Sequence, residues 1–196
     1  MRITALHAFA AIALVVPTRS APEILVSQPQ SKLWVEGTSS LKNFSCKAPE
    51  FTLAVNANGT GAVAAVLAGQ KAVRSIELSV PAAKLDCNNN TMNDHMLKAL
   101  KADENATIRF SLIGYDLAAN TKGAEGTMRG TLTLGGTEHP IDIAAVATDA
   151  GNGAMRIAGS YELALSAFNL KAPSLMFGSI KVGDKVQVKF DLVLKN

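Results

Sequence analysis

Apolar and polar residues alternate along most of the chain with a period of two, which is the pattern of strands that bury one face. The alternation is clearest in 75–80, in 106–117 and in 184–195. Turn residues, chiefly Gly, Pro and Asn-Gly, separate these segments from others of the same kind. Further strands are expected at 31–37, 41–48, 51–56, 126–134, 141–146 and 155–165, and at 62–67, whose Ala and Val residues also suit a helix. The pattern predicts an all-β, mainly antiparallel fold.

One segment has helical spacing instead. Its apolar positions recur at i, i+4, i+7 and i+8, which gives a helix one apolar face; they are Met92, Met96, Ala99 and Leu100. Thr91, with Asp94 three residues later, fits a capping box at the start of this helix. A single amphipathic helix in a β chain has to lay its apolar face on a sheet or in the mouth of a barrel.

So many strands leave exposed edges unless the sheet closes on itself. We therefore expect a lipocalin-like, up-and-down β-barrel of about eight strands with one short amphipathic helix, and a β-sandwich is the alternative. A barrel of this size is filled by side chains or holds one small ligand. Aromatic residues make up only 5% of the chain, which favours a hollow, but composition leaves both interiors open.

The N-terminal residues 1–20 have the outline of a secretory signal peptide. A positive start at Met1-Arg2 is followed by a mostly apolar run at 5–16, and small residues, Thr18 and Ser20, precede a plausible cut before Ala21. The apolar run is short for a bilayer span, and an uncleaved N-terminal anchor is the alternative. We expect a loose N-terminal arm at 21–30, one domain at 31–196, and a periplasmic or secreted protein.

Charge argues against a nucleic-acid partner. Removing Arg2 and Arg19 with the leader leaves 17 basic and 16 acidic side chains, with no basic block among them. No nucleophile–base set or phosphate-binding loop indicates an enzyme, so we expect no catalytic residue and no cofactor. An acid/base pair of Asp94 and His95 is the catalytic interpretation of these two residues. A helix-start carboxylate beside a surface histidine explains them more simply. The two histidines beyond the leader, His95 and His139, have no metal-ligand spacing around them, and no metal site is expected.

Two cysteines, Cys46 and Cys87, are present in a chain that is expected to be exported. An even count in an oxidising compartment favours a disulfide between them. Two buried free thiols are the alternative.

Four short segments follow one another in the order found in a known family. They are Trp34–Ser39, Met92–Met96 leading to Ile108–Phe110, Gly130–Gly136 before Pro140, and Phe168 with Val182–Val186. Together they resemble the YceI-like family of polyisoprenoid-binding, lipocalin-like barrels, over nearly all of 31–195. The resemblance implies an exported eight-stranded barrel with a helix at one end. It also implies a long isoprenoid, such as an isoprenoid quinone, or a similar lipid in an apolar tunnel.

If the barrel holds such a lipid, apolar side chains from the helix and the strands line the tunnel. We predict these residues to be Met92, Met96, Leu100, Ile108, Phe110, Leu112, Tyr161, Phe168, Phe177 and Phe190. The competing interpretation makes them the ordinary core of a filled barrel. The protein is then a non-catalytic structural or stress-response module of the envelope that acts through its surface. The sequence leaves transient membrane contact and homodimer formation open.

Overall fold

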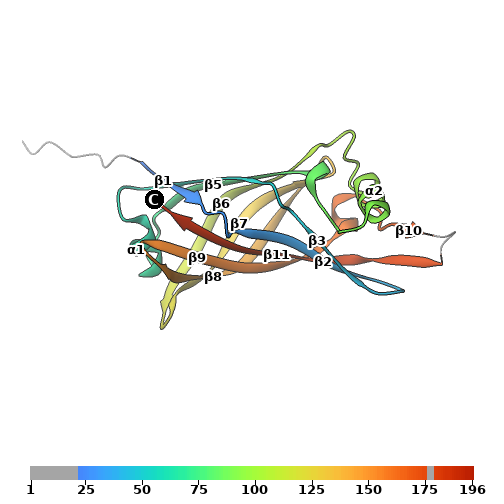
Figure 1. Ribbon diagram of the computed structural model, residues 1–196. Helices are drawn as coiled ribbons and strands as arrows, with labels where there is room; N and C mark the ends of the chain where they lie inside the picture. The colour runs from blue at the N-terminus through green and yellow to red at the C-terminus, as the bar shows by residue number, and fades with distance from the viewer. Residues whose placement is uncertain (1–21, 176–178) are drawn as a thin grey trace, which may run out of the picture.

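The computed structural model describes residues 22–175 and 179–196, so the predicted leader and Phe177 lie outside the described residues. Strands dominate the chain (Figure 1). The strands are β1 Glu23–Ser27, β2 Lys32–Ser39, β3 Asn43–Lys47, β4 Thr52–Ala57, β5 Val73–Pro81, β6 Thr107–Asn120, β7 Gly123–Leu134, β8 Thr137–Gly151, β9 Ala154–Ala164, β10 Ser174–Leu175 and β11 Ile180–Lys195. The helices are α1 Ala62–Leu67 and α2 Asn90–Ala99, with short 3₁₀ turns η1 Ala82–Lys84 and η2 Leu165–Phe168.

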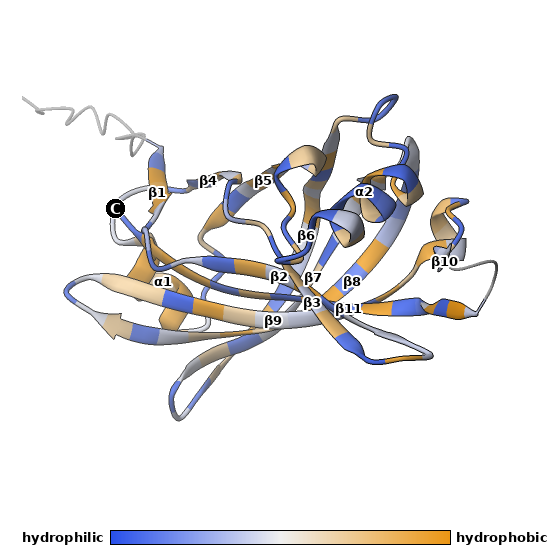
Figure 2. Ribbon diagram, turned by 45° about the vertical axis from the view of Figure 1, so that its right-hand side comes forward, coloured by the Kyte–Doolittle hydropathy of each residue, from blue (hydrophilic) through white to orange (hydrophobic). Residues whose placement is uncertain are grey.

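Eight strands close into an antiparallel barrel in the order β1, β4, β5, β6, β7, β8, β9, β11. The ring is sealed where β1 pairs with the end of β11, at Val26 opposite Lys195. Hydropathy alternates along the strands, as expected when one face of each strand points into the barrel (Figure 2). The predicted lipocalin-like barrel is confirmed, and every predicted strand except 62–67 is present.

Two hairpins extend the wall beyond one end of the barrel. β2 runs along β11 from Lys32 opposite Asp191 to Ser39 opposite Val182, and β3 pairs with β2. β10 folds back on the start of β11, with Leu175 opposite Ile180. In Figure 1 these strands project at the right, beside α2.

The opposite end of the barrel is closed by α1, so the strand predicted at 62–67 is wrong. Alanine is the strongest helix former, and the buried side chains of Ala62, Val63 and Val66 share one helical face. This face packs into a core cluster that includes Met155 of β9 and Leu194 of β11. Burial of this face inside the barrel end therefore favours the helix.

The expected loose arm at 21–30 is also wrong, because it contains β1. Leu25 of this strand is fully buried in the same cluster as α1. β1 pairs with β4 on one side, at Ile24 opposite Asn56, and with β11 on the other. The sequence pattern does not indicate this strand, because Ile24, Leu25 and Val26 are all apolar and therefore do not alternate with polar residues. In the structure Leu25 is buried, and Ile24 and Val26 are exposed.

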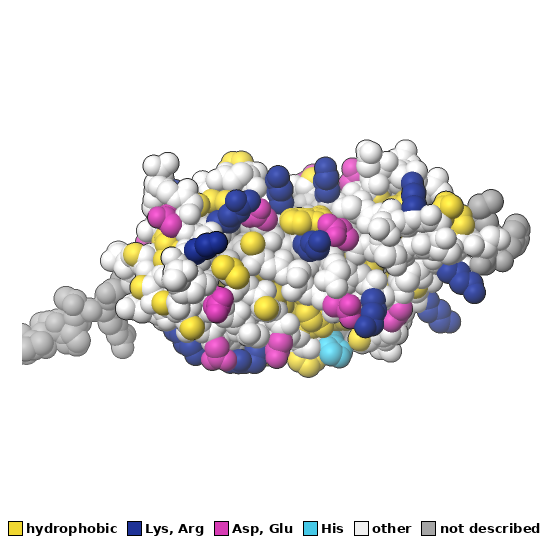
Figure 3. All heavy atoms as spheres, turned by 90° about the horizontal axis from the view of Figure 1, so that it is seen from below, with side chains coloured by type: hydrophobic (Ala, Val, Ile, Leu, Met, Phe, Trp, Pro, Cys, Tyr) yellow, Lys and Arg dark blue, Asp and Glu magenta, His cyan; other side chains and the backbone are white. Residues whose placement is uncertain are grey.

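The outer surface carries charges of both signs. Figure 3 shows acidic and basic side chains interspersed over the face seen from below. Ion pairs also link neighbouring strands of the barrel, for example Arg156 with Asp191 and Lys185 with Glu162. Exposed pairs of this kind contribute little to stability.

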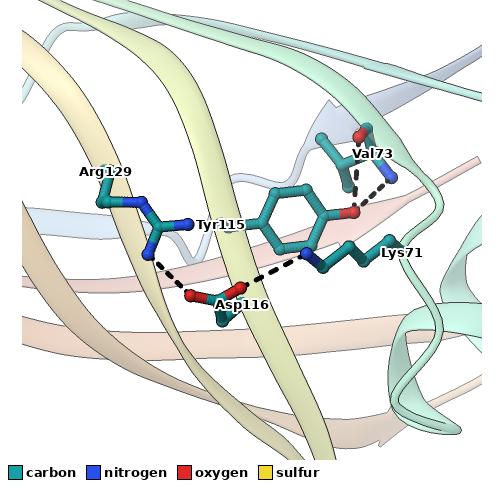
Figure 4. Close-up of polar contacts among 5 residues, drawn as sticks. All are labelled: Lys71, Val73, Tyr115, Asp116 and Arg129. Carbon is teal, nitrogen blue, oxygen red and sulfur yellow. Dashed lines mark hydrogen bonds and ion pairs between the residues drawn. The ribbon is translucent and has the colours of Figure 1, made fainter.

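A tyrosine closes a seam where β5 and β6 separate. Their pairing ends at Glu77 opposite Ser111, and a bulge follows in β6. Beyond it the Tyr115 hydroxyl accepts a hydrogen bond from the Val73 N–H at 2.9 Å and donates one to the Val73 carbonyl at 3.3 Å (Figure 4). Burial raises the pKa of the Tyr115 hydroxyl. Beside it, Asp116 forms ion pairs with Lys71 and Arg129 on the surface.

Candidate ligand-binding pocket

An apolar pocket of about 350 Å³ opens at the end of the barrel that carries α2. This volume lies near the lower end of the range for small-molecule sites, about 300–1,000 Å³. Inward-facing aliphatic side chains from six strands form its walls: Val35, Leu78, Val80, Ile108, Leu132, Leu134, Leu163, Val186 and Val188. Met92 and Met96 of α2 line it from above, and Leu41, Pro173 and Ile180 line it on the side of the two hairpins. The polar residues around it lie on α2, just before α2 and on the β2–β3 hairpin.

A layer of larger side chains forms the floor of the pocket. Phe110, Ile141 and Ile143 make a buried cluster, and Tyr161 and Phe190 pack against it. The ring of Phe110 lies against the wall over Gly130 of β7, and the ring of Phe190 lies over Gly159 of β9, because neither glycine has a side chain in the way. A Cβ at either glycine would overlap the ring. The pocket therefore ends at this layer, in the middle of the barrel.

Composition left open whether the barrel is filled by side chains or hollow. The structure contains both, a filled half and a hollow half. The half near α1 is a packed core that includes Leu25, Val55 and Met155. The half near α2 contains the pocket. No residue of α2 is fully buried, although its methionines face the barrel. This is expected of a helix that covers a hollow, since a solid core would bury its apolar face.

Side-chain caps position the start of α2. The Asn89 side chain accepts a hydrogen bond from the Met92 N–H at 2.9 Å, so Asn89 is the N-cap and the capping box predicted from Thr91 is wrong. The Asp86 carboxylate accepts from the Asn93 side chain and from the Asn88 N–H. These hydrogen bonds, the one from Asn93 first, lower the pKa of Asp86.

A disulfide joins Cys46 of β3 to Cys87, just before α2, which confirms the predicted pairing. Next to it, Lys47 and Asp86 exchange two backbone hydrogen bonds, of 2.7 and 2.9 Å. The sulfur of Cys87 lies 3.8 Å from the Met96 sulfur. The β2–β3 hairpin therefore holds α2 above the pocket.

The structure divides the predicted tunnel residues into two groups. Met92, Met96, Leu100 and Ile108 line the pocket. Outside its lining, Phe110, Leu112, Tyr161 and Phe190 belong to the floor layer, and Phe168 is buried in the core around η2, where its ring packs on His139. Phe177 lies outside the described residues. Burial raises the pKa of the Tyr161 hydroxyl. Ligand contact by any of these residues stays a prediction.

Several lining residues were not predicted from the sequence. Val80 and Leu163 could have been found, because each occupies the inward phase of a clearly alternating strand. Leu41 and Ile180 could not, since their place at the mouth depends on how the two hairpins pair.

The chemistry that this arrangement can perform is burial of apolar groups. None of the described polar or charged side chains is fully buried. The described residues contain no group of three or more His, Cys, Asp or Glu side chains able to hold a metal ion. Within the same residues, no helix has the length and apolar character to span a membrane.

Comparison with known proteins gives one family match. The model of the YceI-like domain matches residues 34–194. No curated protein matches the chain.

Solved structures share the barrel. BcnA of Burkholderia cenocepacia is 19% identical with a TM-score of 0.65, over 84% of this chain and 96% of that one. A polyisoprenoid binding domain from Saccharophagus degradans, implicated in plant cell wall breakdown, is 12% identical with a TM-score of 0.58, over 88% and 97%. The YceI protein of Campylobacter jejuni is 15% identical with a TM-score of 0.57, over 98% and 97%. At these identities the likeness shows the fold.

Proposed function

The chain belongs to the YceI-like family, and we propose from this premise that its pocket binds a lipid of the polyisoprenoid type. The observation that carries the proposal is the apolar hollow under α2, in a barrel whose other half is solid. The polyisoprenoid binding domain of the Saccharophagus degradans structure has the same fold and supports the lipid class. We propose a binding role without a catalytic step.

Burial of the chain supplies the affinity in this proposal. Each buried methylene contributes roughly 0.8 kcal/mol, so a prenyl chain needs no polar contact inside the barrel. Polar lining residues, Asn89, Thr91 and His95, lie on α2 or just before it. A ligand with one polar end would therefore place that end beside α2 and its tail between the strands.

The floor limits how much of the lipid the barrel encloses. Phe110 and Phe190 close the hollow halfway down, against Gly130 and Gly159. A long chain would insert one end as far as this layer and leave the rest beneath α2 and between the hairpins. Methionines suit that position, because their flexible side chains adapt to varied apolar surfaces.

We further propose that the protein is a carrier in the periplasm or outside the cell. The predicted leader at 1–20 would direct it there. The Cys46–Cys87 disulfide supports the same compartment, because disulfides persist in oxidising surroundings. In such a setting the carrier would take its lipid from a membrane and release it to one.

A structural module acting through its surface is the second candidate, and the packed half of the barrel favours it. Native mass spectrometry of protein purified from its own host separates the two candidates. A carrier shows an additional hydrophobic mass, which extraction then identifies. An empty protein that also takes up no added geranylgeraniol would reject the carrier and leave the structural module.

A pair of matched variants locates the site. Val188 lines the pocket on β11, so Val188→Trp places a large side chain in the hollow and should abolish uptake of geranylgeraniol. Val146 is an exposed valine on β8, and Val146→Trp should bind as the wild type does. Circular dichroism checks that both variants fold. Undiminished uptake by a folded Val188→Trp variant would place the ligand elsewhere.

A further inference from the structure

We propose that the two hairpins at the pocket mouth dock the protein on an anionic lipid bilayer. The docking surface comprises Leu41 and Lys42 on the β2–β3 hairpin, and Lys171, Ile180 and Lys181 around the β10–β11 hairpin. This inference rests on the proposed function of the pocket, because a carrier has to reach the membrane that holds its lipid. Beyond that function, the inference names the surface that contacts the membrane and the charge of the lipid that this surface binds.

Hydrogen bonds join the two hairpins into one edge. The Ser40 N–H donates to the Lys181 carbonyl at 2.9 Å, and the Lys181 N–H donates to the Ser40 hydroxyl oxygen at 3.1 Å. Within the first hairpin, the Ser39 hydroxyl donates to the Lys42 carbonyl at 2.8 Å and accepts from the Lys42 N–H at 3.1 Å. Leu41 is therefore presented by an ordered turn.

The apolar part of the surface is continuous with the pocket. Leu41 is 69% exposed and also lines the pocket. The other strongly exposed large apolar side chains of the described residues, Ile24, Val26, Ile113 and Val146, do not line it. Ile180 lines the mouth beside the first hairpin. Leu41 inserted into a bilayer would give a prenyl chain a path from lipid to pocket that avoids water.

The charged side chains on the two segments that carry this apolar tip have one sign. Lys42, Lys171 and Lys181 are exposed and form no ion pair with any described residue. The segments 37–49 and 163–183 contain no Asp or Glu. In Figure 3 basic side chains lie around the right-hand end next to the grey residues, whereas both signs mix over the rest of the face.

Unpaired cations beside an exposed apolar side chain fit an anionic membrane better than a neutral one. Each lysine near an anionic bilayer contributes about 1 kcal/mol, which corresponds to roughly fivefold in affinity. Salt screens this attraction but leaves the insertion of Leu41. The geometry therefore predicts binding that is specific for anionic lipid and weakens as salt rises.

Vesicle flotation tests the proposal with the full mature chain. Wild-type protein should float with phosphatidylethanolamine–phosphatidylglycerol vesicles and much less with phosphatidylcholine vesicles. Lys42→Ala with Lys181→Ala should weaken binding roughly 25-fold, and Leu41→Ser should weaken it further, also at high salt. The matched controls are Lys122→Ala, on the turn between β6 and β7, and Ile113→Ser on the outer wall, and both should bind as wild type does.

Solution binding of farnesol, without vesicles, separates docking from the pocket's own function. Lys171→Ala with Lys181→Ala changes docking residues that do not line the pocket, so this variant should float weakly and bind farnesol normally. Val188→Trp, in contrast, should float with vesicles and bind no farnesol. Equal flotation of the wild type with both vesicle types would overturn the docking surface, even where farnesol binds. So would a Leu41→Ser variant that floats normally but loses a wild-type dimer in light scattering, because that result makes the tip a protein interface.

Discussion

Loss of the Cys46–Cys87 disulfide should destabilise the whole protein and release α2 first. The bridge holds the connection before α2 against β3, and in the described part of the chain β3 pairs with only one strand, β2. Without it, two backbone hydrogen bonds between Lys47 and Asp86 still link the two segments, and an exposed ion pair joins Lys84 to Glu50, just beyond β3. The double variant Cys46→Ala with Cys87→Ala makes this change permanently.

The size of the loss follows from the sequence separation of 41 residues. In the chain-entropy model, a closed loop of this length stabilises the folded state by roughly 4 kcal/mol. For a chain of this size, each kcal/mol corresponds to about 2–4 °C in the midpoint of thermal unfolding, so we expect a fall of roughly 8–16 °C. The loss of roughly 4 kcal/mol is a large share of the free energy of unfolding of a domain, which is typically about 5–15 kcal/mol.

Thermal unfolding followed by circular dichroism measures the global effect, and hydrogen exchange measures the local one. The double variant should melt earlier and should exchange fastest in 82–100. The same protein should also bind geranylgeraniol less tightly, because α2 covers the pocket. Amides of β7 and β8, which are paired on both sides within the barrel, should keep their order of protection.

Reduction of the wild type provides the control, because it breaks the bridge without removing sulfur atoms from the core. Reduced wild type and the double variant should melt at similar temperatures, and dithiothreitol should leave the variant unchanged. A reduced wild type that loses less than about 1 kcal/mol, with unaltered exchange in α2, would refute the reasoning. In that case side-chain packing, and not the disulfide, would hold the connection before α2 against β3.

Three further outcomes are expected. Asn89→Ala removes the N-cap of α2 and should cost about 1 kcal/mol, seen as faster exchange in the first turn of α2, whereas Thr91→Ala should have little effect. Phe168→Ala should cost about 3–5 kcal/mol in denaturant unfolding, because the ring is 1% exposed; a loss under about 1 kcal/mol would mean that the core collapses around it. Tyr115 should ionise above its ordinary pKa of about 10, because burial favours the neutral hydroxyl. Its contribution to stability is therefore complete below that pH and is lost as the pH rises through the folded-state pKa. Tyrosinate absorbance of a Tyr161→Phe variant measures this titration, and an ordinary pKa would contradict it.

The sequence by itself determined the class of the fold. The alternation of apolar and polar residues is a local property of the sequence, so it predicts the strands at 75–80 and 184–195 without knowledge of their neighbours. The need to remove exposed edges then favours a closed barrel. The helix at 92–100 was recognised in the same way, from its spacing, and the disulfide from the even number of cysteines.

The sequence alone mispredicts the elements whose conformation depends on their partners in the tertiary structure. The residues of α1 suit either helix or strand, and the barrel end that buries them decides for helix. β1 has a single fully buried residue, Leu25, and becomes a strand because β4 and β11 both pair with it. The N-cap of α2 is Asn89, because the network around Asp86 places the helix start there.

Only the tertiary structure decided which inward residues meet the hollow. Ile108 and Phe110 are two residues apart on one face of β6, and the sequence makes them equivalent. Ile108 lines the pocket, whereas Phe110 lies against Gly130 and closes its floor. Depth along a barrel is set by register between strands and by what fills the far end. Alternation reports which side of the wall a residue faces, but it carries no information about depth.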